Sequence, residues 1–519
     1  MIGLTFLLLA AAVGYGASRW TGLPAIPLLI AGGVGASTLI ALEMSFLGDV
    51  LTLGVIVLVF VAGIELNPAR LRGRGWAALR VGLFQFLALG SLGLACTFLL
   101  GFDLQAAAYL ALALSASSTL VVVKLLQERQ MLFEPVGRLL TGVLLLQDLL
   151  IILLIPVVNR LPEGWGAIAE GVLATFALMA LTGVLVRWVT PRVLERFDFD
   201  EESLLLITLS VLFGFLGIAN LLGIPLVSGA FLAGVVLSGF PAAALVRGQL
   251  NSMGDFFHAL FFTALGAFLP LPTMGEVGLA LALLLLVVVV TPPLVAFVAE
   301  RSGFSARAAV LSGLLLSQTS EFSLVVALQG VLVGHLDSSP FTVITLVTVA
   351  TMILTPFLAS DRVVWKLLAR HPLRRSPELH RRPDGHILLL GCGRHGQALL
   401  EALIVTREDL VVVDDDPAVV DRLRDAGVTA LRGDISDTDL LRAVGADRAR
   451  VVISTIRRIE DNAPLLDLAR DVFVMVRGFN LEDGRWISER GGQPVLYSEA
   501  AAHDFRDWYE HEWQADARE

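Results

Sequence analysis

Residues 139–158 read LLTGVLLLQDLLIILLIPVV, a stretch in which Asp148 is the single ionisable side chain. An α-helix needs about 20 apolar residues to cross the hydrocarbon core of a bilayer, and this stretch meets that requirement. The rest of the chain has the same character, because 56% of its 519 residues are hydrophobic. Soluble domains contain roughly 45–50%. The sequence therefore predicts an integral membrane protein.

Charged residues divide the chain into two parts. The first 360 residues hold 34 Asp, Glu, Lys and Arg side chains, whereas the remaining 159 residues hold 52. This shift predicts a transmembrane domain at 1–360, an Arg- and Pro-rich linker at 361–384 and a soluble domain at 385–519. The chain has a net charge of −10 and no basic cluster that would predict a nucleic-acid partner. Its two cysteines cannot build a disulfide framework, which favours a cytosolic soluble domain.

Apolar runs between charged or Pro/Gly breaks predict about 13 transmembrane helices. They span 3–18, 23–40, 46–66, 76–101, 105–124, 136–158, 164–189, 203–219, 222–239, 254–270, 275–299, 305–333 and 338–358. With the N-terminus outside, 14 of the 15 Lys and Arg residues in this part fall at inner loops and helix ends, and only Arg160 falls outside. No basic segment precedes the first run, so we expect a first helix rather than a cleaved signal peptide. Thirteen helices then place the C-terminal domain in the cytosol.

Two of these segments carry polar interruptions, SASST at 115–119 and SQTSE at 317–321. The segments lie seven helices apart, so they cross the membrane in opposite directions. Transporters built from inverted repeats carry broken helices at matching positions of the two halves. The alternative is that these hydroxyls only hydrogen-bond neighbouring helices. We expect inverted repeats with two crossed broken helices.

Asp148 is the first candidate for an ion-binding residue. An ionised carboxylate in mid-membrane is costly unless it faces water or a cation. Burial favours the protonated form and a bound cation favours the ionised form, so a proton and a monovalent metal ion compete for the carboxylate. Access from one side of the membrane at a time would turn this competition into exchange. The alternative is a structural Asp that caps a broken helix or pairs with a buried base.

Further ion-binding candidates lie beside Asp148 or within the interruptions. They are Gln147, Ser117, Ser118, Thr119, Ser320 and Glu321. Because Gln147 is neutral, the pair offers one titrating acid where a double-acid site would offer two. For Glu321 the sequence leaves open a cation ligand, a gate, or a structural carboxylate stabilised by half-helix N-termini.

The soluble part has the pattern of a parallel α/β sheet. Strands are predicted at 386–390, 410–413, 451–454 and 472–476, with helices between them. GCGRHG at 391–396 follows the first strand and opens a helix, and Asp414 ends the second strand, as in dinucleotide-binding folds. The residues expected at the nucleotide are Gly391, Gly393, Arg394, His395, Gly396 and Asp414. The expected ligand is NAD(H) or an adenine nucleotide such as AMP or ATP; the alternative is an empty Rossmann shell used for assembly.

These stretches resemble the monovalent cation:proton antiporter-2 family, and within it the Kef-type potassium efflux systems with a regulator-of-potassium-conductance N-terminal domain. The similar stretches are 59–66, 114–119, 146–148, 223–231, 316–322, 391–397, 413–414 and 433–434. The resemblance implies that Gln147 and Asp148 carry the cation and the proton, and it adds Asp434 to the nucleotide site. It also implies a core domain that moves against a dimerisation domain, a homodimer with paired nucleotide domains, and a bacterial or archaeal inner membrane.

The chain departs from this family pattern at two residues. Thr291, in VVVTPP at 288–293, stands where the family commonly has a lysine that pairs with the acid. Without that lysine, we expect electroneutral 1:1 exchange. His395 stands where Kef-type proteins commonly have an aromatic residue, and the chain stops at Glu519 after one Rossmann domain. The resemblance therefore implies glutathione control only weakly.

The sequence thus predicts a secondary antiporter that exchanges K⁺ or Na⁺ for H⁺ across a lipid bilayer under nucleotide control, and not an enzyme. No G-x-x-x-x-G-K-[ST] phosphate loop is present to supply primary energy. Three alternatives remain. A nucleotide-gated cation channel would pass currents that survive loss of Asp148, a membrane oxidoreductase would transfer hydride, and a nucleotide sensor would transport nothing.

Overall fold

The chain folds into two compact units. Unit 1 comprises Met1–Leu125, Val136–Val298 and Val310–Val363, and unit 2 comprises Leu126–Pro135, Ala299–Ala309 and Val364–Glu519. The computed structural model describes residues 2–40, 42–65, 75–189, 192, 201–238, 242–368, 383–404, 409–456, 458–496, 502 and 506. The inner loops expected at 66–74 and 193–200 and most of the expected linker lie outside these residues.

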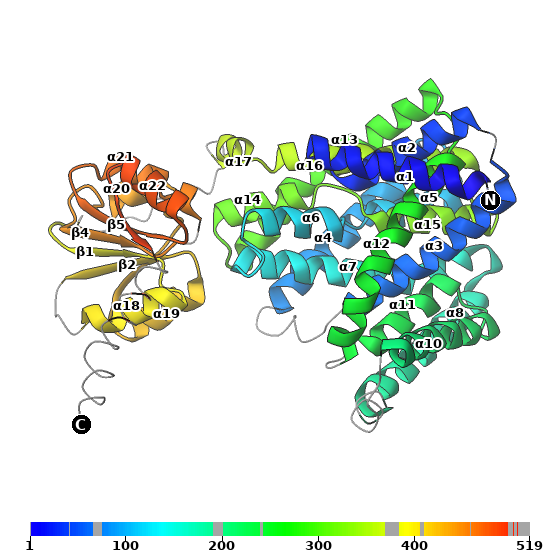
Figure 1. Ribbon diagram of the computed structural model, residues 1–519, viewed down its shortest axis with the longest axis horizontal. Coiled ribbons are helices and arrows are strands. Elements are labelled where there is room, and N and C mark those ends of the chain that lie inside the picture. The colour runs from blue at the N-terminus through cyan, green and yellow to red at the C-terminus, as the bar shows by residue number, and fades with distance from the viewer. Residues whose placement is uncertain are drawn as a thin grey trace. The chain divides into compact units, whose positions relative to one another are not determined.

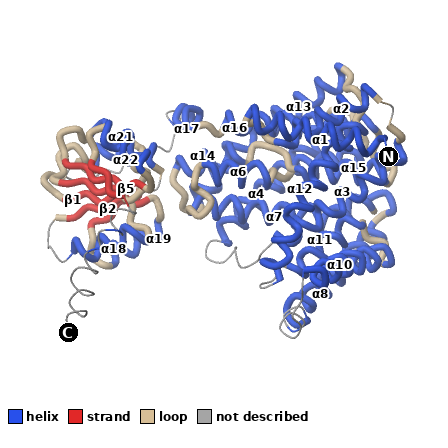
Figure 2. Tube along the Cα trace, in the orientation of Figure 1, coloured by secondary structure: helices blue, strands red, loops and turns tan. Residues whose placement is uncertain are grey.

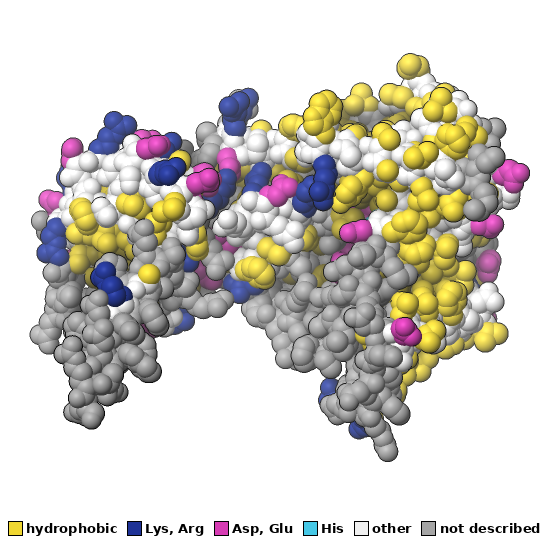
Figure 3. All heavy atoms as spheres, in the orientation of Figure 1, with side chains coloured by type: hydrophobic (Ala, Val, Ile, Leu, Met, Phe, Trp, Pro, Cys, Tyr) yellow, Lys and Arg dark blue, Asp and Glu magenta, His cyan; other side chains and the backbone are white. Residues whose placement is uncertain are grey.

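Each expected transmembrane segment coincides with one helix or with two half-helices (Figure 1). The helices are α1 Ile2–Thr21, α2 Ala25–Leu39, α3 Met44–Glu65, α4 Gly75–Leu99, α5 Leu104–Leu114, α6 Thr119–Glu128, α7 Pro135–Asn159, α8 Trp165–Val184, α10 Glu201–Leu221, α11 Leu226–Leu237, α12 Ala242–Phe268, α13 Met274–Arg301, α14 Ala306–Leu315, α15 Glu321–Leu332 and α16 Ser338–Leu358. Among the described residues, 8 helical spans are long and apolar enough to cross a membrane. Hydrophobic side chains form broad patches on the visible face of this helical part (Figure 3), as contact with lipid requires.

The two expected interruptions are confirmed as breaks. Helix α5 ends at Leu114 and α6 begins at Thr119, while α14 ends at Leu315 and α15 begins at Glu321. Ser320 caps α15, since its side chain accepts from the Phe322 N–H. A break inside a membrane must satisfy its freed backbone groups within the protein, and the hydroxyl side chains at both breaks serve this purpose.

Close helix packing follows the inverted repeat. A Cβ atom at Gly33 of α2 would lie 1.9 Å from a backbone oxygen of α12, and one at Gly266 of α12 would lie 2.0 Å from a backbone oxygen of α2. The pair α3 and α11 repeats this arrangement with Gly63 and Gly234, at 2.2 and 2.1 Å. A shift of seven transmembrane segments places α2 on α11 and α3 on α12, so the inverted repeat relates the two helix pairs. Small residues allow such backbone approach in membranes.

The soluble part is a parallel sheet between two helical layers (Figure 2). Its strands are β1 Ile387–Leu390, β2 Leu410–Asp414, β3 Thr429–Arg432, β4 Val451–Ser454, β5 Phe473–Gly478 and β6 Gln493–Leu496, in the order β3-β2-β1-β4-β5-β6. Helices α18 Arg394–Ile404 and α19 Pro417–Asp425 cover one face. Helices α20 Thr438–Ala443, α21 Ala463–Leu468 and α22 Leu481–Glu489 cover the other. The α/β class is as expected, and β3 and β6 are additional to the expected strands.

The expected linker begins with a helix. Residues Asp361–Leu368 form α17, whereas 369–382 lie outside the described residues. The sequence DRVVWKLL alternates charged and apolar positions at helical spacing, a pattern that favours an amphipathic helix.

Candidate functional site

Ser117 joins the two breaks of unit 1. Its hydroxyl, fully buried, donates to the Leu316 carbonyl oxygen over 2.8 Å, so the first residue after α14 meets the residues between α5 and α6. Its backbone N–H donates to Gln147 Oε1 on α7 over 3.0 Å. Ser323 of α15 completes the crossing by donating its hydroxyl to the Ala113 carbonyl of α5. The breaks expected to cross are thus tied together by named hydrogen bonds.

Asp148 lies beside this crossing. Its side chain is only 5% exposed, and Oδ2 accepts from the Thr119 hydroxyl over 3.0 Å at the start of α6. Its other oxygen, Oδ1, has no hydrogen-bond partner among the described residues. Burial of a carboxylate oxygen without a hydrogen-bond partner is unfavourable in free energy, so the site suits a proton or a cation at this position.

Glu321 is the second buried carboxylate of the crossing. It is 4% exposed and opens α15 directly after the second break, and its Oε2 has no partner among the described residues. Ser118, also buried, lies at the neighbouring break and its Oγ accepts from the Val121 N–H over 3.3 Å. Serine and threonine hydroxyls, one amide oxygen and two carboxylates therefore surround the crossing, which is a donor set of oxygen ligands suited to a hard cation.

The second break is held from α16. Thr319 N–H donates to Thr351 Oγ1 over 3.2 Å, and Thr319 Oγ1 donates to Thr348 Oγ1 over 2.9 Å. Ser320, which caps α15, is fully buried as well. Among the described residues, Thr291 Oγ1 of α13 is buried without a hydrogen-bond partner. Thr291 is followed by Pro292, whose carbonyl oxygen would lie 2.5 Å from a Cβ atom at Gly313 of α14.

The glycine loop of unit 2 has the geometry of a phosphate-binding turn. Gly391 has φ +85°, a backbone conformation that side chains disfavour. A Cβ atom at Gly396 would lie 2.1 Å from the Gly391 carbonyl oxygen, so helix α18 starts tightly against the strand. Gly393, between these two glycines in the loop, is exposed. The side chains of Arg394 and His395 lie outside the described part of the chain.

Asp414 holds this loop from the end of β2. Its Oδ2 accepts from the Cys392 N–H over 2.6 Å and its Oδ1 accepts from the Asp416 N–H over 2.8 Å. Burial raises the pKa of Asp414, while these two N–H donors lower it. Burial and the neighbouring Asp414 raise the pKa of the Cys392 thiol to about 11, so the thiol stays protonated at neutral pH. In this structure Asp414 shapes the loop, and both of its oxygens already accept hydrogen bonds.

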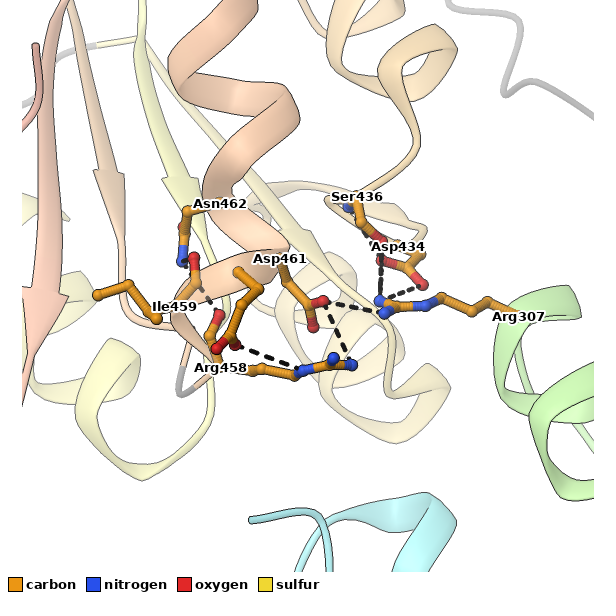
Figure 4. A network of polar contacts seen from close by, with 8 residues as sticks. Arg307, Asp434, Ser436, Arg458, Ile459, Asp461 and Asn462 are labelled. Carbon is orange, nitrogen blue, oxygen red and sulfur yellow. Dashed lines mark hydrogen bonds and ion pairs between the residues drawn. The ribbon is translucent and has the colours of Figure 1, made fainter. Parts of the chain in front are cut away.

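Asp434 lies in an ion-pair network of unit 2 (Figure 4). The Arg307 guanidinium, 12% exposed, lies 3.4 Å from Asp434 Oδ2 and 2.9 Å from Asp461 Oδ1. It also donates to Ser436 Oγ over 2.8 Å. Arg458 approaches the same Asp461 oxygen at 3.8 Å. Asp434 follows β3 and Asp461 follows β4, so Arg307 bridges carboxylates at the carboxyl edge of the sheet, where ligands of such folds bind.

Several contributing residues escape sequence reasoning. They are Gln85, Ser323, Thr348, Thr351 and Arg307, whose partners lie 29 to 210 positions away. Gln85 carried a local signal, because it is the one amide in the apolar stretch GWAALRVGLFQFLALGSLGLACTFL. Nothing local marks the other four.

Two crossed broken helices with buried carboxylates define a secondary ion transporter, here joined to a Rossmann-like domain. The chain belongs to the sodium/hydrogen exchanger family. The transmembrane domain of that family matches residues 6–360, and the TrkA-N domain matches residues 387–480. The protein is therefore a multi-pass membrane antiporter of the Kef type with a C-terminal TrkA-N domain.

Known proteins similar to this chain agree with that assignment. The glutathione-regulated potassium-efflux system protein KefC of Salmonella schwarzengrund (strain CVM19633) is 30% identical over 430 residues, which are 81% of this chain and 69% of that protein. The structure of the sodium proton antiporter MjNhaP1 from Methanocaldococcus jannaschii has a TM-score of 0.54 at 13% identity and covers 71% of this chain and 99% of its own. That likeness shows the shared antiporter fold.

Proposed function

We propose that the protein exchanges K⁺ for H⁺ at Asp148, with Na⁺ as the alternative cation. The observation that carries this proposal is the partly satisfied Asp148 carboxylate, with Oδ2 bonded to Thr119 and Oδ1 without a partner among the described residues. The preference for K⁺ rests on the potassium-efflux relative at 30% identity. The proton and the cation compete for one carboxylate, because each neutralises a charge that burial makes costly.

Exchange follows from alternating access to this carboxylate. A cation that enters from one side displaces the proton from Asp148, and a proton from the opposite side later displaces the cation. The contact between Gln147 and Ser117 holds α7 against the first break. The oxygens around the ion are proposed to come from Ser118, Thr119, Ser320 and Glu321. With Thr291 in place of a lysine, one proton leaves for one cation and the cycle moves no net charge.

The TrkA-N unit is proposed to bind NAD(H) or an adenine nucleotide and to regulate exchange. Gly391 and Gly396 allow the tight turn, and open space at Gly393 leaves room for a pyrophosphate at the N-terminus of α18, where backbone N–H groups and the helix dipole favour an anion. Arg394 and His395 are proposed phosphate neighbours. Asp414 supports this loop through the Cys392 N–H, and Asp434 lies at the same edge of the sheet.

The assembly is proposed to be a homodimer in a bacterial or archaeal inner membrane, with its N-terminus outside and the TrkA-N unit in the cytosol. The charge bias of the loops supports this orientation, since Arg160 alone among 15 basic residues falls on the outer side.

Dissipation of a pH gradient in everted vesicles tests the exchange proposal. Addition of K⁺, Na⁺ or Li⁺ should dissipate the gradient with the wild type and not with Asp148→Asn. Asp103→Asn is the matched control, because Asp103 caps α5 through the Ala106 N–H and asparagine caps helices equally well. A potential-sensitive dye should report no charge movement. Currents that survive Asp148→Asn would instead support the channel alternative.

A further inference from the structure

Helix α4 runs along the first break of the exchange site. A Cβ atom at Gly82 would lie 3.0 Å from Leu146 of α7, and one at Gly90 would lie 2.9 Å from the Ser115 hydroxyl. Between these two contact points lies Gln85, which is fully buried. The buried face of α4 is otherwise formed by apolar residues, glycines and Thr97. Gln85 is therefore the one amide that α4 brings to the break, among the described residues.

Gln85 bonds the residue that joins the two breaks. Its Nε2 donates to Ser117 Oγ over 3.1 Å, and Ser117 Oγ in turn donates to the Leu316 carbonyl over 2.8 Å. A hydroxyl has a single hydrogen to donate. By donating to the oxygen of Ser117, Gln85 directs that hydrogen towards Leu316, which is the first residue of the second break.

The same serine contacts the helix that carries Asp148. The Ser117 N–H donates to Gln147 Oε1 over 3.0 Å, and Thr119, two residues on, donates to Asp148 Oδ2. The chain of hydrogen bonds from Gln85 thus reaches both breaks and the neighbour of the titrating acid. A change in the position of Ser117 would therefore alter its contacts with both breaks and with Gln147.

Two polar atoms of this network have no hydrogen-bond partner among the described residues, which argues against a role of Gln85 in packing alone. Gln85 Oε1 and Gln147 Nε2 are both buried without a hydrogen-bond partner among the described residues. An unpartnered buried polar atom is unfavourable, and an apolar side chain of similar size would avoid that penalty. A position that served packing alone would gain nothing from the amide.

We propose that Gln85 is a positioning residue for exchange, which sets the cation affinity of the Asp148 site by fixing Ser117 at the crossing of the two breaks. This inference rests on the proposed exchange of a monovalent cation for a proton. It assigns Gln85 no contact with the ion. Its loss should therefore weaken cation binding while the maximal rate remains.

Proteoliposomes that contain the full chain provide the test, with the apparent KM for K⁺ and for Na⁺ measured separately from the maximal rate. Gln85→Leu should raise the apparent KM about tenfold and keep the maximal rate within about twofold, the size expected from loss of one buried hydrogen bond. In a Ser117→Ala background, Gln85→Leu should add nothing further, because both changes remove the same contact.

Thr97→Val is the matched control. Thr97 is also buried on α4, but its hydroxyl bonds the Gly93 carbonyl of its own helix over 2.7 Å. Its apparent KM should equal that of the wild type. An unchanged KM in Gln85→Leu, or effects of Gln85→Leu and Ser117→Ala that add fully, would overturn the proposal.

A binding measurement separates failure of this inference from failure of the proposed function. If the wild type exchanges no cation, thermal stabilisation of the purified full chain by K⁺ or Na⁺ replaces the transport assay. Stabilisation of the wild type that is weakened in Gln85→Leu supports the positioning role. Equal stabilisation of both proteins overturns that role, and absence of stabilisation in the wild type overturns both the role and the exchange proposal.

Discussion

At the scale of single residues, the Asp148 site depends on one hydroxyl that stabilises the ionised carboxylate. Thr119 Oγ1 donates to Asp148 Oδ2 over 3.0 Å, and a hydrogen bond to a charged group contributes about 1.5–3 kcal/mol. Thr119→Val keeps the shape and removes the donor, so the proton should compete more effectively with the cation. We expect the apparent cation affinity at pH 7 to fall about tenfold or more and to recover at higher pH. A pH series of exchange rates checks this, and an unchanged pH profile would contradict it.

His386 gives unit 2 a dependence on pH. The ring is 2% exposed and precedes β1, and burial lowers its pKa from the usual 6.5. Because the unfolded chain then binds more protons than the folded one, this contribution to stability is complete above about pH 6.5 and is lost as the pH falls through the folded pKa. Hydrogen exchange of residues 387–390, corrected for intrinsic rates, should accelerate on acidification. His386→Gln should show a smaller acceleration, and equal acceleration would refute this role.

At the scale of elements, glycine decides which helices pack backbone to backbone. Gly33→Ala forces a Cβ atom to within 1.9 Å of the Thr263 carbonyl oxygen of α12, whereas Gly35→Ala on the same helix meets nothing within 4 Å. Backbone atoms cannot yield as a flexible side chain can. We therefore expect Gly33→Ala to lower the amount of folded protein in membranes severalfold and Gly35→Ala to leave it unchanged. Fluorescence-detected size-exclusion chromatography measures both, and equal behaviour would rule out the close approach of α2 and α12.

The elements that the sequence predicts are those with strong local signals. Long apolar runs predict the transmembrane helices, and the polar stretches at 115–119 and 317–321 predict the breaks, because each gathers several polar residues in succession inside an otherwise apolar run. Strand β3 escapes prediction because only one of its four residues is buried at the sheet edge, and β6, at the opposite edge, escapes for the same reason. Gln85, Ser323 and Arg307 escape assignment because their roles depend on partners brought near only by folding.

At the scale of the whole molecule, helix α14 spans the boundary between the two units, and under the proposed function it would connect the nucleotide domain with the ion site. Helix α14 begins at Ala306, carries Arg307 in its first turn and ends at Leu315, directly before the break that Ser117 contacts. Arg307 belongs to the 299–309 segment of unit 2 and pairs there with Asp434 and Asp461. A ligand that changes the environment of Asp434 would therefore act on the start of this helix.

Arg307→Gln tests this connection in the full chain. Loss of two partly buried ion pairs, each worth about 1.5–3 kcal/mol as hydrogen bonds to charged groups, should raise hydrogen exchange of residues 299–309 about tenfold or more. Exchange of cations for protons without nucleotide should stay within about twofold of the wild type, because Asp148 and the crossing are unchanged. The response to NAD(H) or AMP should disappear. Arg442→Gln is the control, since its pair with Asp439 is about half exposed on both sides and surface pairs contribute little. A nucleotide response that survives Arg307→Gln would show that control reaches the crossing by another route.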